Sequence, residues 1–330
     1  YVELTQRGKL PALRPPAVVR SSKMLSIDAA TRRNLELTRT LSGDREGSLL
    51  AVIDRTVSGA GARLLADRLT APSTDPTLIR DRLDLVQFFV EEEPCRQAVR
   101  ALLKETPDMA RALARLSLGR GGPRDLAAVR DGLAAAERAY EVLDHPASPP
   151  PMAALRQPLH GHDALIKALT DALADDLPHL TRDGGFVAKG YDAALDELRT
   201  LRDESRRHTA ALQARYIQDT GITGLKIKHN NVLGYFIEVT PTHADKMAKD
   251  LPEEVRQQFI HRQTLASAAR YTTTELGDLE GKISSAADRA LALEQSLFAR
   301  LVGQTLDHAG PIAAAAEALA GLDVATALAD

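Results

Sequence analysis

Apolar residues recur at helical spacing through most of the chain. Six stretches show this pattern, at residues 49–69, 78–90, 95–104, 108–118, 124–143 and 163–174. Apolar residues that recur every three or four positions line one face of a helix, and segments rich in proline and glycine separate the stretches. The pattern therefore predicts a helical core.

Two longer helical patterns follow, at residues 192–218 and 275–302. The second has apolar residues spaced alternately by three and four positions, at Leu276, Leu279, Ile283, Ala286, Ala290, Leu293 and Leu297. Such a heptad seam packs against a partner helix along its whole length. We expect two antiparallel helices, each roughly 40 Å long at about 1.5 Å per residue. A seam facing an ordinary helical core is the alternative.

The periodicity changes between these helices, at residues 220–271. β-Branched and aromatic residues stand there at strand-like intervals, which predicts two strands. Asn230 and Asn231 can supply the positive φ of a tight hairpin turn, and Pro241 is expected to end the second strand. A short helix is expected over residues 250–258. A strand-rich insert thus lies at the end of a pair of long helices.

The chain is expected to divide into four segments: an extended linker at residues 1–22, a first helical part at 23–219, the insert at 220–271 and a second helical part at 272–330. Prolines make the first segment an extended arm. The chain begins at Tyr1 and ends inside a helical pattern, so we expect a piece of a longer protein.

Composition narrows the class of protein. Hydrophobic residues make up 44% of the chain and charged residues 26%, which is ordinary for a globular protein. The formal net charge is -3, so contact with nucleic acid requires a local basic patch. Cys95 is the only cysteine, which fits a reducing compartment. We find no apolar run of the about 20 residues that span a bilayer and no signal peptide, and we expect a cytoplasmic protein without membrane contact.

No constellation for catalysis or cofactor binding is evident. The segment 221–226 has glycines and a lysine, but it lacks phosphate-loop spacing and precedes a strand instead of a helix. His160 and His162 are the densest potential metal ligands, and nothing nearby completes a ligand set. We expect a loop there, with Asp163 capping the next helix. No GxSxG motif is present, so we predict no catalytic residue, no metal site and no cofactor in this chain.

A basic segment surrounds the expected hairpin. From Arg202 to Asn231 there are six Lys or Arg residues against three acidic residues. In a strand, Lys226 and Lys228 project to the same face, and Asn230 and Asn231 add amide donors at the turn. This combination predicts contact with phosphate oxygens. The same pattern also fits a solvated charged hairpin.

A second polar group lies where the chain is expected to re-enter a helix. Its members are Arg262, Gln263, Thr264, Ser267 and Arg270. Backbone N–H groups at a helix start bind phosphate oxygens, and hydroxyl, amide and guanidinium groups extend such a surface. Contacts of this kind position a protein on nucleic acid without reading bases.

Five segments stand out as a set of motifs: SIDAATRRNLEL (26–37), LLAVIDRTVSGAGARLLADRLTAP (49–72), TRDGGFVAKGYDAALDELR (181–199), GLKIKHNNVLGYFIEV (224–239) and FIHRQTLASAARYTTTEL (259–276). In this order they resemble the central region of the MutS family of DNA mismatch-repair proteins. The resemblance covers essentially the whole chain, and residues 1–20 are similar to the tail of the connector domain of that family.

The resemblance implies a mainly α fold, in which a helical core and long antiparallel lever helices carry a small β-rich clamp insert. It implies that the clamp contacts the backbone of duplex DNA, through Lys226, Lys228, Asn230, Asn231, Arg262, Gln263, Thr264, Ser267 and Arg270. Many relatives carry Lys or Asn after the QTL of the clamp, where this chain has Ala266 and Ser267. This departure shifts the expected contacts toward residues 262–264 and the strand lysines.

The resemblance also implies the partners of a longer parent protein. Members of the family are DNA-dependent ATPases that act as dimers around DNA and signal through a MutL partner. The lever would couple the clamp to an ATPase domain that holds ATP and Mg. This chain has neither a Walker A motif nor an N-terminal Phe-x-Glu mismatch-reading element, so we expect no enzymatic activity of its own. The alternative is a helical scaffold or dimerisation module whose hairpin tip docks another protein.

Overall fold

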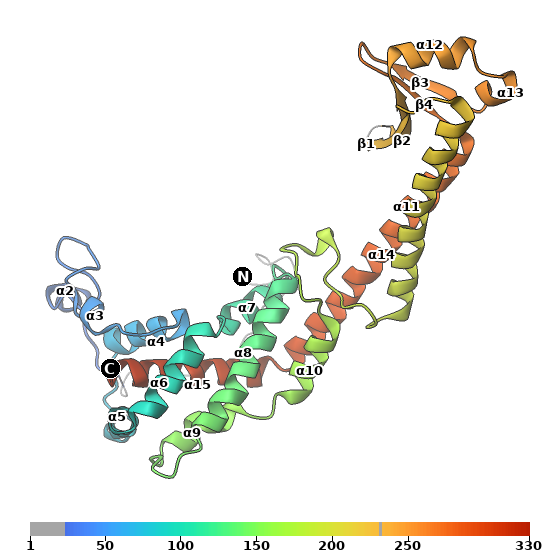
Figure 1. Ribbon diagram of the computed structural model, residues 1–330. Helices are drawn as coiled ribbons and strands as arrows, with labels where there is room; N and C mark the ends of the chain where they lie inside the picture. The colour runs from blue at the N-terminus through green and yellow to red at the C-terminus, as the bar shows by residue number, and fades with distance from the viewer. Residues whose placement is uncertain (1–23, 231–232) are drawn as a thin grey trace, which may run out of the picture. The chain divides into compact units, whose positions relative to one another are not determined.

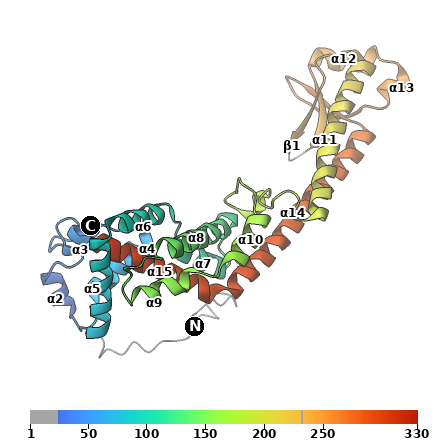
Figure 2. The ribbon, with the colours of Figure 1, turned by 60° about the horizontal axis from the view of Figure 1, so that its bottom comes forward.

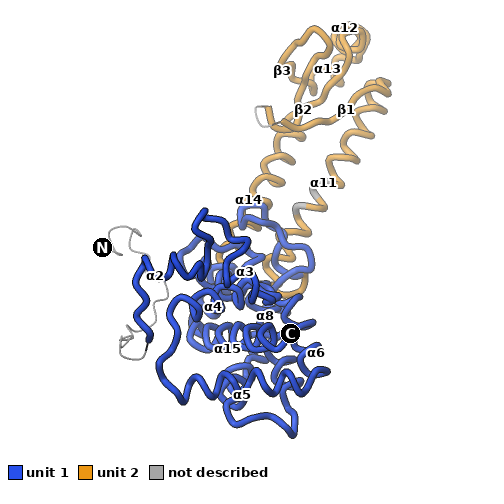
Figure 3. The backbone as a smooth tube through the Cα atoms, turned by 90° about the vertical axis from the view of Figure 1, so that its left-hand side faces the viewer, with its two compact units in different colours: residues 1–188, 297–330 blue, residues 189–296 orange. Residues whose placement is uncertain are grey.

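The computed structural model describes residues 24–230 and 233–330, apart from the side chains of residues 202, 205 and 206. The expected linker at residues 1–22 and the expected turn residue Asn231 lie outside the described residues. The chain forms two compact units (Figure 3), one ending at Ala188 and completed by Leu297–Asp330, the other spanning Lys189–Ser296. The boundaries of the four expected segments stay a prediction.

The first unit is helical (Figure 1). It contains α2 (Ala29–Asn34), α3 (Leu49–Ile53), α4 (Gly59–Thr70), α5 (Pro76–Glu91), α6 (Glu93–Glu105), α7 (Met109–Ser117), α8 (Pro123–Val142), α9 (Met152–Arg156), α10 (Asp163–Ala172), α15 (Ala309–Leu328) and the short 3-10 helices η2 (Gln157–Leu159) and η3 (Thr181–Asp183). Side chains fix several helix starts, because Asp28, Ser48, Ser58, Asp75 and Asp108 each accept a hydrogen bond from an amide in the following first turn. Such caps satisfy N–H groups that have no partner within the helix.

Helix α15 lies at the centre of the first unit, among α4, α6 and α8 (Figures 1 and 2). Residues on all its sides are buried, including Ile312, Leu319, Leu322 and Val324. By length and composition it could cross a membrane, but 72% of its most apolar window is buried inside the structure, as in the core helix of a globular protein. The expectation that no apolar run approaches this length was therefore wrong.

The second unit contains two long helices, α11 (Ala193–Thr220) and α14 (Thr274–Asp307), of which α14 continues into the first unit. Ion pairs join Arg199 to Glu294 and Arg215 to Glu275, so the helices run antiparallel, as predicted. The predicted seam of α14 faces inward at Leu276, Ile283, Ala286, Ala290 and Leu297, which are buried. The left-handed backbone of Gly221, with φ 63°, ends α11, as glycine commonly does at the C-terminus of a helix.

The two helices carry a four-stranded antiparallel sheet with strand order β1-β2-β4-β3. The strands are β1 (Lys226–Asn230), β2 (Gly234–Val239), β3 (Ile260–Thr264) and β4 (Ala269–Thr272), and helices α12 (Pro241–Lys249) and α13 (Glu253–Arg256) connect β2 to β3. Strands β1 and β2 were predicted, whereas β3, β4 and α12 were not. Every residue of β3 is exposed, so it lacks the alternation that indicates a strand. Pro241 ends the strand pattern but also starts α12, because proline suits the first turn of a helix.

One face of the sheet is buried. Ile227, Ile237, Val239, Ala269 and Tyr271 point to a hydrophobic cluster that also contains Leu212 and Tyr216 of α11, Met247 of α12 and Leu276 of α14. Since successive side chains of a strand point to opposite faces, the residues between them face the other way. The core of the second unit thus decides which side chains of the sheet are available for binding.

The described ends of the β1–β2 connection differ from the expectation for Asn230. Gly234, with φ 69°, has the left-handed backbone, and Asn230 does not. A Cβ at Gly234 would meet only the carboxylate end of the flexible Glu280 side chain, so it is the positive φ that favours glycine at this position. Asn230 instead accepts a hydrogen bond through Oδ1 from the amide of Leu233, at 2.7 Å.

Candidate nucleic-acid interface

The face of the sheet opposite the core carries a row of charged and polar side chains. Lys226 pairs in register with Glu238, Glu238 with Arg270, and Arg270 with Gln263. The row therefore crosses all four strands. Lys228 and its cross-strand partner Phe236 lie on the same face. We call the face defined by Lys226, Lys228, Phe236, Glu238, Arg270 and Gln263 the polar face.

A β-bulge places Gln263 in this row. The register between β3 and β4 shifts between His261 and Gln263, which makes Arg262 the extra residue. A bulge of this kind re-aims the side chains that follow it. Gln263 consequently lies opposite Arg270 and accepts a hydrogen bond from Arg270 Nη1 at 3.0 Å.

Ion pairs bind the polar face together. Lys228 Nζ donates to Glu238 Oε1 at 2.6 Å, and Arg270 Nε donates to Glu238 Oε2 at 3.3 Å. The Arg270 guanidinium also lies 4.5 Å from the centre of the Phe236 ring. The hydrogen bond from Lys228, and then that from Arg270, hold the pKa of Glu238 below its ordinary value. Glu238 is therefore a carboxylate at neutral pH, and the three cations of the polar face, Lys226, Lys228 and Arg270, leave it with a net positive charge.

The structure brings some predicted contact residues together and separates others. Lys226, Lys228, Gln263 and Arg270 share the polar face. Asn230 lies at the end of β1 beside Gly234, whereas Thr264, opposite Ala269, lies at the other end of the sheet. Ser267 is exposed in the turn between β3 and β4, Arg262 is exposed at the bulge, and Thr264 Oγ1 pairs with His261 Nε2 at 2.8 Å. The eight of these residues that the structure describes thus do not form one cluster, and Asn231 lies outside the described part of the chain.

The expected helix start at the second polar group was wrong. Residues 262–264 and Arg270 lie on strands, and α14 begins only at Thr274. Phosphate binding by amides of a helix start therefore has no basis at these residues, because their N–H groups belong to a sheet. The predicted side-chain contacts of this group stay a prediction, and of its members Gln263 and Arg270 lie on the polar face.

Glu238 and Phe236 are the members of the polar face that sequence reasoning missed. The segment GYFIEV places both on the face opposite Ile237 and Val239. This alternation was a usable signal. The register that sets Glu238 between Lys226 and Arg270 was not readable, since it depends on β4, which the pattern did not predict.

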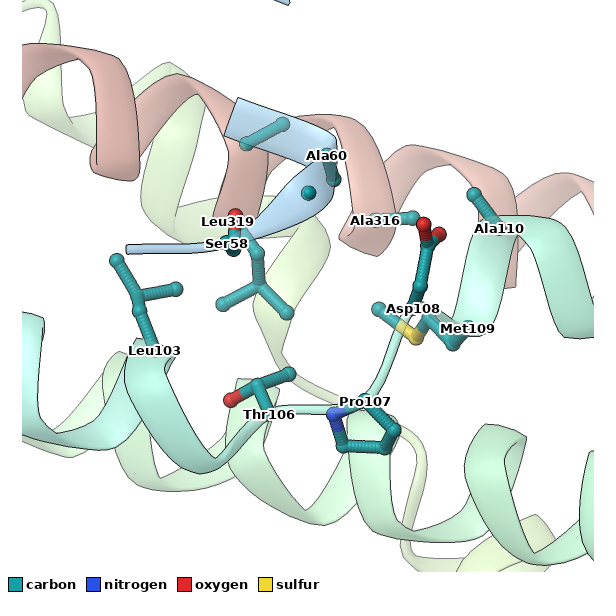
Figure 4. Close-up of a pocket in the computed structure, with 12 residues that line it drawn as sticks. Ser58, Ala60, Leu103, Thr106, Pro107, Asp108, Met109, Ala110, Ala316 and Leu319 are labelled. Atoms are coloured by element: carbon teal, nitrogen blue, oxygen red, sulfur yellow. The ribbon is translucent and has the colours of Figure 1, made fainter. Parts of the chain in front are cut away.

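A cavity in the first unit offers no competing site. It lies where the start of α4, the α6–α7 connection and α15 meet, and Ser58, Leu103, Asp108 and Leu319 are among its lining residues (Figure 4). Its volume of about 40 Å³ has room for a water molecule, whose share of liquid volume is about 30 Å³. Substrate pockets are commonly about 300–1,000 Å³, so this cavity is too small to hold a substrate.

The histidine-rich segment serves to anchor a loop. His160 Nδ1 and Glu137 Oε2 lie 2.7 Å apart, and the amide of His162 donates to Glu137 Oε1 at 2.7 Å. Among residues 24–230 and 233–330, no three His, Cys, Asp or Glu side chains are placed to hold a metal ion. The predicted cap was wrong: α10 begins at Asp163, and its cap residue His162 makes no side-chain capping bond.

The fold and the polar face define a helical module that presents a small charged sheet on two long helices. Residues 30–329 match the family model described as MutS domain III, and the chain belongs to this family. The resemblance seen in the motifs is thereby confirmed.

Curated relatives match the chain over its whole length. It is 56% identical to the DNA mismatch repair protein MutS of Rhodopseudomonas palustris (strain BisB5), 55% to that of Dinoroseobacter shibae and 52% to that of Nitrobacter hamburgensis. All of this chain is covered in each comparison, but only 36–37% of each relative. The chain thus spans about a third of the length of these relatives.

Proposed function

We propose that this chain is the core, lever and clamp part of a DNA mismatch repair protein, and that the polar face contacts the sugar–phosphate backbone of duplex DNA. The observation that carries this proposal is the polar face, on which Lys228 and Arg270 pair with the Glu238 carboxylate and Lys226 stands opposite Glu238 in register. The printed function of the relatives, DNA mismatch repair, supports DNA as the ligand.

The side chains of the row suit backbone contact. Lys226 is exposed, and no ion pair or hydrogen bond of its side chain is found within the described part of the chain. The side chain of Lys228 is 50% exposed, so its ion pair with Glu238 is worth only about 0–1 kcal/mol and can yield to a phosphate. Lysine is a point charge without a fixed donor geometry. Contacts from these lysines would hold DNA without distinguishing bases.

We further propose that α11 and α14 act as a lever. With 28 and 34 residues, they are about 42 and 51 Å long at 1.5 Å per residue. The seam of α14 and the Arg199–Glu294 pair, at 2.8 Å, support a stiff pair of helices. In the parent protein this pair would couple the sheet to an ATPase domain that holds ATP and Mg. Dimer formation around DNA, a MutL-type partner and a cytoplasmic location belong to the same proposal.

The proposal is tested by titrating a short fluorescein-labelled duplex with the 330-residue chain and its variants. We expect a dissociation constant in the non-specific range of about 10⁻⁴–10⁻⁶ M. Lys226→Ala and Lys228→Ala should each weaken binding. Each should also reduce the salt slope, which is the steepness with which log K falls with log salt concentration, by up to about 0.9. Matched and mismatched duplexes should lose affinity equally, because backbone contacts carry no sequence information. Lys249→Ala, the same change of charge at an exposed position on α12, is the control and should have little effect.

Two results would refute backbone contact by the polar face. One is unchanged affinity in both lysine variants. The other is a loss of affinity for only one of the two duplexes, matched or mismatched, because backbone contacts carry no sequence information. Light scattering would show whether the chain forms a dimer without DNA. Such a dimer, together with unchanged DNA affinity in both lysine variants, would favour the protein-docking alternative.

A further inference from the structure

Glu238 occupies the middle of the cations on the polar face. Its two carboxylate oxygens are used separately, Oε1 by Lys228 at 2.6 Å and Oε2 by Arg270 at 3.3 Å. Lys226 stands directly opposite it on β1. A DNA phosphate that approaches these cations therefore meets a carboxylate that already binds two of them.

The two bound cations differ in how firmly they are held. The Arg270 side chain is only 21% exposed, and it is fixed additionally by Gln263 at 3.0 Å and by the Phe236 ring. Lys228 is 50% exposed, and among the described residues Glu238 is its one ion-pair partner. Lys228 can therefore exchange the carboxylate for a phosphate, whereas Arg270 stays in place.

We propose that Glu238 is a built-in counter-ion that limits the affinity of the polar face for the DNA backbone. This inference rests on the proposed function. Glu238 competes with phosphate for Lys228. Its negative charge also offsets one of the three positive charges of the polar face. Affinity for DNA follows the number of phosphate charges that a protein neutralises. The contact is thereby kept weak, which suits a clamp that has to hold DNA without becoming immobile on it.

Glu238→Gln tests the inference because glutamine has the same shape and keeps an oxygen acceptor. We expect duplex affinity to rise about threefold to tenfold near 50 mM salt, with a salt slope steeper by up to about 0.9 and a difference that shrinks toward 200 mM. The urea unfolding midpoint should change little. Glu254→Gln, the same change at an exposed position on α13, is the matched control and should raise affinity less than twofold by general attraction.

The competition predicts a further result. In a Lys228→Ala background, Glu238→Gln should raise affinity by a smaller factor, since the cation that it releases is absent. An equal rise in both backgrounds, or an equal rise with Glu254→Gln, would show only long-range attraction and would overturn the inference. A fall in affinity with Glu238→Gln would make Glu238 a positioning residue and would overturn it too.

The inference and the proposed function fail in different ways. If Lys226→Ala weakens DNA binding while Glu238→Gln does not strengthen it, only the counter-ion role is wrong. If Lys226→Ala and Lys228→Ala leave binding unchanged, the polar face does not hold DNA and both are wrong.

Discussion

Asp323 on α15 accepts a hydrogen bond from the amide of Ser58 at 2.8 Å and another from its hydroxyl at 2.5 Å. The amide of Val57 donates to the second carboxylate oxygen at 3.0 Å. Asp323 has no exposed surface. One buried carboxylate thus fixes the start of α4 to the central helix of the first unit, although the two are more than 260 positions apart in the chain.

We predict that Asp323→Ala destabilises the chain by about 2–4 kcal/mol, because it leaves two amides and a hydroxyl without their acceptor in a partly buried site. Urea unfolding followed by circular dichroism measures this. Asp330→Ala is the control: Asp330 is 39% exposed and pairs with Arg55 and Arg100, and such surface pairs are worth about 0–1 kcal/mol. Equal losses in the two variants would contradict the anchoring role.

Gly61 gives a second test of the same contact. A Cβ at Gly61 would lie 2.1 Å from Asp323 Oδ2, and the carboxylate cannot retreat without losing its hydrogen bonds. Gly61→Ala should therefore cost about 1–3 kcal/mol, as overpacking of an interior does. A Cβ at Gly303 in α14 would meet nothing within 4 Å, so Gly303→Ala should stabilise the chain by about 0.5–1 kcal/mol. The thermal unfolding midpoint should fall in Gly61→Ala and rise in Gly303→Ala, relative to the unsubstituted chain. A higher midpoint for Gly61→Ala would contradict the prediction.

The two ion pairs between α11 and α14 should differ in strength. In the Arg199–Glu294 pair the side chains are 19% and 5% exposed, and in the Arg215–Glu275 pair they are 49% and 57% exposed. Arg199→Met should cost about 1.5–3 kcal/mol because it removes a charged hydrogen-bond donor from a buried carboxylate, whereas Arg215→Met should cost under about 1 kcal/mol. Urea unfolding compares the two, and a larger loss at Arg215 would disprove this ranking.

Glu137 should make stability depend on pH in the acidic range. Burial raises its pKa, but the His162 amide and the His160 side chain outweigh burial, and the pKa lies below the ordinary 4.5. A carboxyl whose pKa is lower in the folded state stabilises the fold above the unfolded pKa, and this stabilisation is lost as pH falls through the folded pKa. Glu137→Gln should cost about 1–2 kcal/mol at neutral pH.

The pH dependence separates this effect from a general loss of packing. Unfolding free energies of the unsubstituted chain and of Glu137→Gln should converge as pH falls from the ordinary pKa of 4.5 through the lower pKa of the folded state, because the carboxyl group then becomes protonated in the folded chain as well. A constant difference between pH 7 and 3 would mean that the charge of Glu137 is not what stabilises the loop.

The sequence by itself determined the elements whose signal is local. The heptad spacing from Leu276 to Leu297 predicted α14 and its partner, because helical periodicity is written in neighbouring positions. Alternation predicted β1 and β2, and with them the shared face of Lys226 and Lys228. The motifs were sufficient to predict the family, since they extend along the whole chain, and the family model confirmed it.

Only the tertiary structure decided the register of the sheet and the contacts between distant segments. Strand β3 is exposed at every position, so no periodicity marks it, and the bulge at Arg262 shifts Gln263 by one residue relative to β4. Register is set by the apolar pattern of the paired strands and by the turn that joins them, and a strand exposed at every position has no such pattern to read. For the same reason the place of Glu238 between three cations, and that of Asp323 under Ser58, could not be predicted before the chain was folded.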